Sequence, residues 1–215
     1  MGYVTICSGR AGFETMTSPK AKTAAVFVDR DGVLIRDVGY LFQVGDLEVL
    51  PRVPEALRLM RRAGLKVIVV SNQSAVGRGW LSEKDLIAIH EELRRQLARS
   101  GAFLDGIYYC PHHPTEGRGP YRTACSCRKP NPGMIERACL ELGVDPSVSY
   151  VVGDQERDME LAFRVRAKGI WIRKGGSSEP ESSLRCRVAE DLWQSALWIR
   201  EDFAHQGKDG QKCVR

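Results

Sequence analysis

Long apolar segments are missing from this chain of 215 residues, since no run approaches the roughly 18 apolar residues of a membrane-spanning helix. The opening stretch MGYVTICSGRAGFETM lacks the continuous apolar core of a secretory signal peptide. Ile6 stands where an N-myristoylation signal carries serine or threonine. We therefore expect a cytoplasmic protein with no membrane partner.

Paired cysteines and a concentrated basic patch are missing as well. The chain has seven cysteines, an odd number that does not fit a fully paired disulfide framework, and cytoplasmic cysteines are normally reduced or bound to metal. The net charge is +5, but basic residues recur at the spacing of solvated helix faces, as in Arg58, Arg61, Arg62, Arg94, Arg95 and Arg99. The charge alone therefore does not predict nucleic-acid binding.

Strand-like apolar runs alternate with helical patterns along the chain. The runs are 24–29, 65–72, 106–110, 149–154 and 169–173, and the helical patterns are 54–63, 82–97, 132–142, 156–167 and 189–202. Strands that are apolar on both faces and alternate with helices indicate a parallel sheet covered on both sides. The sequence predicts an α/β fold, a three-layer doubly wound sandwich with a mostly parallel central sheet. We expect one domain over 23–203, a weakly ordered extension over 1–22 and a C-terminal tail over 204–215.

Polar groups gather where the predicted strands end, which is where parallel α/β sheets bind their ligands. Asp29 and Asp31 are two positions apart, so both can face one site while Arg30 points away. Two carboxylates this close repel unless a cation lies between them, and oxygen ligands beside a phosphate suit Mg²⁺. Asp154 and Asp158 follow a later strand and would join them, although Asp29 and Asp154 could instead cap the helices that come after them.

Other strand ends supply groups that fit a phosphate. Ser71 and Asn72 would donate hydrogen bonds to phosphate oxygens, and Lys129 would supply a fixed positive charge.

A loop rich in cysteine, CPHHPTEGRGPYRTACSCRKP, spans residues 110–130. Three thiols and one imidazole suit a four-coordinate structural zinc, with His113 as a competing ligand for His112. The alternative is a set of reduced loop residues. A bound zinc would fix the loop and so position Arg128 and Lys129, which come directly after it. The predicted zinc ligands are Cys110, His112, Cys125 and Cys127.

The segments DRDGVL, VSNQS, RKPNPGM and VGDQERDM resemble, in this order, the four motifs of the haloacid dehalogenase superfamily of aspartate-dependent phosphatases. The resemblance covers residues 25–173. It implies that Asp29 attacks phosphorus to form an aspartyl-phosphate and that Asp31 serves as acid and base. It further implies Mg²⁺ bound by Asp29, Asp154 and the backbone carbonyl of Asp31, with Ser71 and Lys129 holding the phosphoryl group and Asp158 behind them.

The segments GIYYCPHHP and CSCRKPNPGM narrow the resemblance to zinc-containing heptose 1,7-bisphosphate phosphatases and, more loosely, to histidinol-phosphate phosphatases. Those enzymes lack a large cap domain, and no long insertion separates the motifs here. The resemblance implies an enzyme that removes the 7-phosphate of D-glycero-D-manno-heptose 1,7-bisphosphate during the synthesis of nucleotide-activated heptose for lipopolysaccharide. We expect the protein to be a monomer. Arg78 and Arg128 would bind the second phosphate and the hydroxyls of this phosphorylated sugar.

Two positions depart from that pattern. Gln155 stands where many of these phosphatases carry lysine, and Ala75 stands where they usually carry glycine. The substrate therefore stays open, with histidinol phosphate or another small sugar phosphate as alternatives. A nucleic-acid 3′-phosphatase or a zinc-bearing nucleic-acid module would explain the pI of 8.9, but the aromatics near the motifs, Tyr40, Trp80 and Tyr121, are too few for base stacking.

Overall fold

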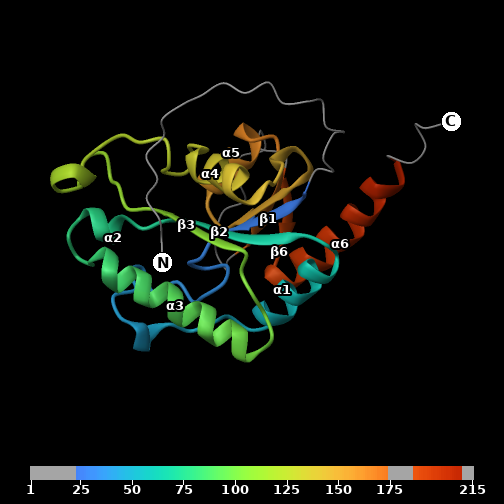
Figure 1. Ribbon diagram of the computed structural model, residues 1–215, viewed down its shortest axis with the longest axis horizontal. Coiled ribbons are helices and arrows are strands. Elements are labelled where there is room, and N and C mark those ends of the chain that lie inside the picture. The colour runs from blue at the N-terminus through green and yellow to red at the C-terminus, as the bar shows by residue number, and fades with distance from the viewer. Residues whose placement is uncertain (1–22, 174–185, 210–215) are drawn as a thin grey trace, which may run out of the picture.

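A computed structural model describes residues 23–173 and 186–209, so the predicted extension over 1–22 lies outside the described residues. Six parallel strands form one sheet in the order β3-β2-β1-β4-β5-β6 (Figure 1). The strands are β1 (Ala25–Val28), β2 (Lys66–Asn72), β3 (Gly106–Cys110), β4 (Tyr150–Gly153), β5 (Lys168–Ile172) and β6 (Cys186–Ala189).

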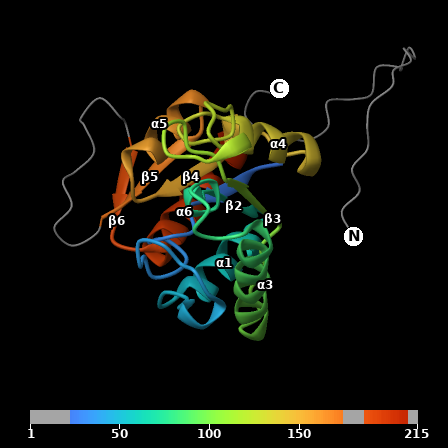
Figure 2. The ribbon, with the colours of Figure 1, turned by 90° about the vertical axis from the view of Figure 1, so that its left-hand side faces the viewer.

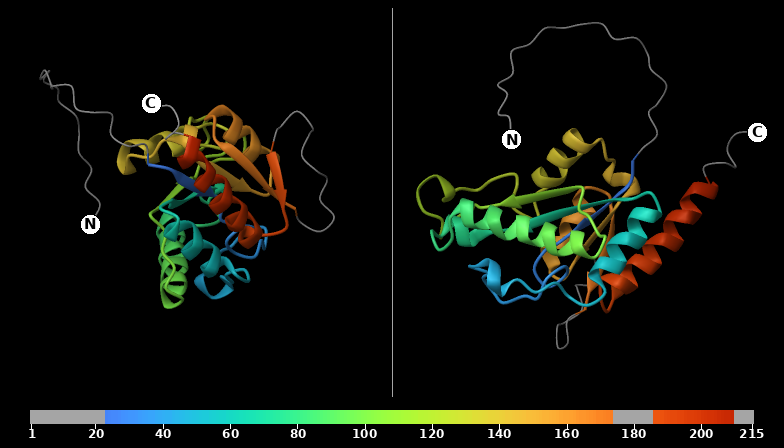
Figure 3. Two further views of the ribbon diagram at one scale, coloured as in Figure 1. Left: turned by 90° about the vertical axis from the view of Figure 1, so that its right-hand side faces the viewer. Right: turned by 60° about the horizontal axis from the view of Figure 1, so that its bottom comes forward.

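Helices cover both faces of the sheet, as Figure 1 and Figure 2 show. One face carries α1 (Val53–Arg62), α3 (Glu83–Arg99) and α6 (Leu192–Asp209), and the other carries α4 (Gly133–Leu142) and α5 (Glu156–Arg164). Helices α1 and α6 run side by side in both views of Figure 3. The predicted three-layer doubly wound sandwich is confirmed. None of the helices in the described ranges is long and apolar enough to cross a membrane.

Successive side chains of β1 point to opposite faces of the sheet, and both sets are apolar and buried. Val26 and Val28 pack with the layer of α1, α3 and α6, whereas Ala25 and Phe27 pack with the layer of α4 and α5. Ser82 begins α3 as predicted, because its hydroxyl oxygen accepts a hydrogen bond of 3.1 Å from the backbone N–H of Asp85.

The C-terminal part differs from the prediction. The sequence predicts a helix over 189–202, whereas the structure places β6 at Cys186–Ala189 and α6 at Leu192–Asp209. The edge strand β6 has only four residues, and exposed Arg187 interrupts its apolar pattern, so its sequence gives little strand signal. Residues 204–209, the start of the predicted tail, continue α6 as helix. A short helix, α2 (Ser74–Gly77), was not predicted either.

The described residues contain no inserted cap domain. Only loops and short helical turns connect β1 to α1 and β3 to α4. These two connections lie at the carboxyl ends of their strands, where they border the candidate site.

Candidate active site and cysteine cluster

The candidate site lies at the carboxyl ends of β1, β2 and β4. The strand order turns back at β1, which pairs with β2 on one side and with β4 on the other, and such a reversal leaves a crevice at the strand ends. A cavity of about 450 Å³ opens there. Six of the residues predicted for the site line this cavity: Asp29, Asp31, Ser71, Asn72, Arg78 and Arg128.

Lys129 lies under the cavity and is almost completely buried. Its Nζ atom is 3.0 Å from Oδ1 of Asp29 and 2.7 Å from Oδ1 of Asp158. Burial by itself lowers the pKa of Lys129, but the charges of Asp158 and Asp29 outweigh burial and raise this pKa above its usual value. The ammonium group therefore stays charged beside the predicted nucleophile.

Asp158 connects Lys129 to the start of α5. Its Oδ2 atom accepts a hydrogen bond of 3.1 Å from the backbone N–H of Gln155, so Asp158 caps the helix from inside the protein. Burial raises the pKa of Asp158 to about 6, even though the charge of Lys129 lowers it. Gly153 makes this arrangement possible, since a Cβ atom at position 153 would overlap the side chain of Asp158.

Three buried carboxylates form a donor set that fits a hard divalent cation. Each of Asp29, Asp154 and Asp158 offers a carboxylate oxygen, and these three atoms lie within 4.8 Å of one another. Asp158 already bonds Lys129 and the start of α5. Both carboxylate oxygens of Asp158 are used in this way, so Asp29 and Asp154 are the side chains that could hold Mg²⁺, with Asp158 behind them.

Arg30 points away from the cavity, as the alternation along the strand predicts, but it also contacts Asp31. Its side chain runs toward the layer of α3, but the guanidinium group turns back and bonds the carboxylate of Asp31. Alternation along a strand predicts only where Cβ points, and a side chain as long as arginine can return to its neighbour. Asp31 thus faces the cavity and is also held from behind.

The polar residues at the end of β2 contact one another and the loop before α4. The Nδ2 atom of Asn72 donates to the backbone O of Lys129 at 3.2 Å, and its Oδ1 atom accepts from the backbone N–H of Lys129 at 3.0 Å. The hydroxyl of Ser71 accepts a hydrogen bond of 2.9 Å from Nε2 of Gln73. Asn72 lines the cavity, but its amide group holds the backbone that carries the lysine.

The four predicted zinc ligands come together at the end of β3. The Sγ atom of Cys110 is 3.5 Å from that of Cys125 and 3.1 Å from that of Cys127, and Nδ1 of His112 is 3.3 Å from Cys127 Sγ. A tetrahedral zinc with Zn–S bonds of about 2.3 Å separates its sulfur ligands by roughly 3.8 Å, so one ion can reach all four atoms. The cluster can hold a metal ion.

The competition between the two adjacent histidines is resolved by geometry. His112 joins the cysteines. His113 lines the cavity instead, and its Nδ1 atom accepts a hydrogen bond of 3.0 Å from the backbone N–H of Glu116. Arg128 ties the two sites together, because Nη1 donates to the backbone O of His112 at 3.0 Å while the residue lines the cavity.

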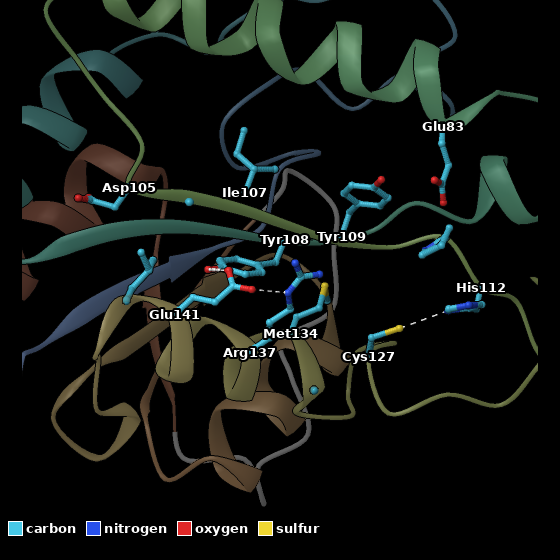
Figure 4. A pocket seen from close by; sticks show the side chains of 14 residues that line it. Glu83, Asp105, Ile107, Tyr108, Tyr109, His112, Cys127, Met134, Arg137 and Glu141 are labelled. Atoms are coloured by element: carbon cyan, nitrogen blue, oxygen red, sulfur yellow. Dashed lines mark hydrogen bonds and ion pairs between the residues drawn. The ribbon is translucent and has the colours of Figure 1, made fainter. Parts of the chain in front are cut away.

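A larger hollow of about 630 Å³ lies between β3 and α4, on the other side of the cysteine cluster (Figure 4). Its polar groups satisfy one another: the Tyr108 hydroxyl donates to Oε2 of Glu141 at 2.9 Å, and Nε of Arg137 donates to Oε1 of Glu141 at 2.7 Å. No aspartate of the strand ends lines this hollow. The chemistry therefore belongs to the smaller cavity.

Comparison with known proteins shows the family of the chain. A family model described as "HAD-hyrolase-like" matches residues 126–195. The D-glycero-beta-D-manno-heptose-1,7-bisphosphate 7-phosphatase of Pasteurella multocida is 41% identical over 180 residues, which are 84% of this chain and 92% of that protein. The chain belongs to the heptose bisphosphate phosphatase family of the haloacid dehalogenase superfamily. It is therefore a phosphoric monoester hydrolase.

Other relatives and solved structures are also similar to the chain. The relative of the same name from Escherichia coli (strain K12) is 38% identical over 74% of this chain and 83% of its own length. The crystal structure of the D,D-heptose 1,7-bisphosphate phosphatase from B. bronchiseptica, complexed with magnesium and phosphate, has a TM-score of 0.72 and 29% identity. The match covers 84% of this chain and 99% of that one. A protein from Mesorhizobium loti described as a HAD-like phosphatase has a TM-score of 0.76 at 29% identity, over 85% and 88% of the two chains.

In this family member, the cavity has a cationic wall that the sequence only partly predicts. Arg157, from the first turn of α5, lines the cavity with Arg78 and Arg128. Burial, and then the charges of Arg157 and Arg78, lower the pKa of Arg128. Arg78 pairs with Glu116 and lies over the ring of Trp80, 4.9 Å from its centroid. The Nε atoms of Arg78 and Arg157 are buried without a hydrogen-bond partner among the described residues.

Three residues of the site were not predicted from the sequence: Arg157, Gln73 and His90. Arg157 lies only three positions after Asp154, but which side of α5 it occupies depends on where the helix begins. Gln73 follows Ser71 and Asn72 in the segment SNQ, and this position directly after two predicted site residues could have indicated its role. His90 is one histidine on an amphipathic helix, where a packing role is the usual reading.

Proposed function

We propose that this phosphatase hydrolyses phosphomonoesters with Mg²⁺ through an aspartyl-phosphate on Asp29, and that it removes the 7-phosphate of D-glycero-D-manno-heptose 1,7-bisphosphate. One observation carries the proposal: the carboxylate of Asp29 borders the cavity while the buried ammonium of Lys129 lies 3.0 Å behind it. The relatives with this name at about 40% identity support the choice of substrate.

The first half of the proposed reaction transfers the phosphoryl group to the protein. A carboxylate oxygen of Asp29 attacks phosphorus, and the bond from phosphorus to the sugar oxygen breaks. Asp31, two residues along the same chain end, gives its proton to the departing sugar oxygen. The backbone N–H of Arg30 donates to Oδ1 of Asp29 at 2.7 Å and helps to orient the attacking carboxylate.

The second half regenerates the carboxylate. Asp31, now deprotonated, takes a proton from water as the water oxygen attacks phosphorus, and the bond to Asp29 breaks to release inorganic phosphate. The hydroxyl of Ser71 at the cavity and the ammonium group of Lys129, which contacts Asp29, are both almost fully buried, and they would stabilise the charge that builds up on the transferring phosphoryl oxygens.

The donor set of Asp29 and Asp154 would hold Mg²⁺. When bound, the ion supplies positive charge to the phosphoryl oxygens, as this reaction class requires. The cysteine cluster would hold a structural Zn²⁺ that fixes the loop carrying Arg128 and Lys129.

The cationic wall supports a substrate with a second anionic group. Arg78, Arg128 and Arg157 line one cavity. Although Arg78 pairs with Glu116, the Nε atoms of Arg78 and Arg157 are buried without a hydrogen-bond partner among the described residues, and an anionic group of the substrate would supply one. A bisphosphorylated sugar carries one phosphate for Asp29 and another for these arginines. We propose that the protein acts as a cytoplasmic monomer in the synthesis of nucleotide-activated heptose, with no nucleic-acid partner.

A substrate panel tests the proposal. The panel consists of heptose 1,7-bisphosphate as both C1 anomers, histidinol phosphate, fructose 1,6-bisphosphate and a 3′-phosphorylated oligonucleotide, compared by kcat/KM with Mg²⁺. We expect the heptose bisphosphate to be preferred and Asp29→Asn to be inactive on it while the fold is kept. Preference for histidinol phosphate or the oligonucleotide would overturn the substrate assignment, and substantial activity of Asp29→Asn would overturn the nucleophile.

A further inference from the structure

Arg30 is a buried charged residue between the two predicted catalytic aspartates. Its position continues the alternation of Val26 and Val28, so its side chain enters the layer of α3 below the sheet, and only 1% of it is exposed. A buried guanidinium group at this depth cannot contact a substrate in the cavity. It acts through the residues that it bonds.

The first of these residues is Asp31. Nη2 of Arg30 donates to Oδ1 of Asp31 at 2.8 Å, and Nε lies 3.1 Å from Oδ1 and 3.2 Å from Oδ2. The guanidinium group therefore contacts both carboxylate oxygens, which restricts rotation of the carboxylate more than a single ionic contact does.

Gln73 completes a closed set of hydrogen bonds with the same two side chains. Its Oε1 accepts from Nη2 of Arg30 at 2.9 Å, and its Nε2 donates to Oδ2 of Asp31 at 2.9 Å. The same Nε2 donates to the hydroxyl of Ser71. Both polar ends of the amide are used, so Gln73 fits here in one orientation only.

His90 on α3 holds the far side of the guanidinium group. Nη1 of Arg30 lies 3.2 Å from Nε2 of His90, and because an arginine can only donate, this Nε2 must be the unprotonated acceptor. Burial and then the charge of Arg30 lower the pKa of His90 to about 3, so the ring stays neutral at physiological pH.

We propose that Arg30, Gln73 and His90 form a buried clamp, here called the Arg30 clamp, which fixes the carboxylate of Asp31 in the orientation needed for proton transfer. The inference rests on the proposed role of Asp31 as acid and base. Proton transfer requires the donor and acceptor heavy atoms to lie about 2.6–3.2 Å apart. The side chain of Asp31 is 25% exposed, so without the clamp its carboxylate would be free to rotate. Arg30, Gln73 and His90 are positioning residues, and Asp31 is the group that meets the substrate.

The test compares two leaving groups in a single turnover with enzyme in excess. A sugar alkoxide needs a proton to depart, whereas p-nitrophenolate does not. The sugar phosphate is the member of the panel with the highest kcat/KM, and the other substrate is p-nitrophenyl phosphate. A group that only supports the fold would slow both substrates alike, whereas a group that positions the acid slows the sugar phosphate selectively.

We expect Arg30→Lys to slow release of the sugar by about 100-fold, within the usual contribution of general acid catalysis, while release of p-nitrophenolate falls by less than about threefold. The KM for the sugar phosphate should change little. His90→Leu removes the acceptor but no charge, and it should also slow the sugar phosphate more than p-nitrophenyl phosphate, by a smaller factor. His90→Gln, which keeps an acceptor, should be faster on the sugar phosphate than His90→Leu. Arg36→Lys, at an exposed arginine paired with Glu48, is the matched control.

Asp31→Asn separates this inference from the function on which it rests. It should slow the sugar phosphate selectively; if it does not, the role of Asp31 as acid is wrong and the clamp fails with it. If Asp31→Asn is selective but Arg30→Lys and His90→Leu slow both substrates equally or neither, only the clamp is wrong. His90→Leu decides the matter if Arg30→Lys does not fold.

Discussion

The ammonium nitrogen of Lys129 lies 2.7 Å from Oδ1 of Asp158, and each side chain is only 1% exposed. The same nitrogen contacts Asp29 at 3.0 Å, so one buried cation contacts two buried carboxylates, one at the end of β1 and one in the first turn of α5. A buried pair of this kind costs desolvation to form, but removing one partner leaves the other charge uncompensated.

Lys129→Met should therefore damage both stability and turnover. We expect the free energy of unfolding in urea to fall by about 3–5 kcal/mol, as for other broken buried ion pairs. We expect kcat to fall by about 100- to 1000-fold, the usual effect of removing a group that faces transition-state charge. Lys168→Met, at an exposed lysine paired with Asp202, should cost less than about 1 kcal/mol. Equal effects of the two substitutions would contradict the assignment of Lys129.

The two adjacent histidines give a matched test of the cysteine cluster. His112→Ala should lower the zinc content from about one ion per chain and lower Tm, because a metal that binds only the folded state stabilises it. His113→Ala should keep the zinc, since His113 faces the cavity. Elemental analysis and thermal unfolding of both variants are the measurements. If the wild-type protein contained no metal and His112→Ala had the same Tm as the wild type, the cluster would be a set of reduced thiols.

Arg157→Gln should weaken recognition of the second phosphate without harming the chemistry. We expect KM for the bisphosphate to rise by about tenfold or more, since a charge-assisted hydrogen bond contributes about 1.5–3 kcal/mol. KM for a sugar monophosphate should stay within about twofold, because it has no group for Arg157 to bind. Steady-state kinetics on both substrates check this, and an equal rise in the two KM values would place Arg157 at the transferred phosphate instead.

His90 should make the protein sensitive to acid. Its pKa is lowered to about 3 in the folded state. Below about pH 6.5, His90 is therefore protonated in the unfolded chain but stays neutral in the folded chain. Stability from this residue is present above pH 6.5 and is lost as pH falls, by about 2 kcal/mol between pH 7.5 and pH 5. His90→Gln should remove about this much of the pH dependence. The measurement is denaturant unfolding of the wild type and of His90→Gln at both pH values. If both proteins lost the same free energy of unfolding between pH 7.5 and pH 5, the prediction for His90 would be wrong.

Much of the site follows from the order of strands and polar ends in the sequence. Asp29, Ser71 and Asp154 come directly after apolar runs, and parallel strands bring such ends together whatever the details of packing. The cysteine cluster followed from the residue types in one loop. Only the choice between His112 and His113 needed coordinates, because adjacent loop residues can turn to either side.

The features that sequence did not predict depend on side chains that reach across layers. Arg30 points away from the cavity as expected, but its length lets its guanidinium group also contact Asp31, while Gln73 after β2 and His90 on α3 supply acceptors. The strand β6 pairs with β5 although two of its four residues are exposed, so its apolar pattern is too short to recognise.

The hydrogen bonds between Asn72 and the backbone of Lys129 have a consequence for chain length. Cys127 belongs to the cysteine cluster, and two residues later Lys129 is fastened to the end of β2 through both amide atoms of Asn72. The segment between Cys127 and Lys129 is thus held in place at both ends, so an added residue could not be accommodated without moving one of them. One inserted amino acid between Cys127 and Lys129 would have to pull either the thiolate from its cluster or the ammonium group from Asp29. We therefore expect this segment to tolerate a substitution better than a change in its length.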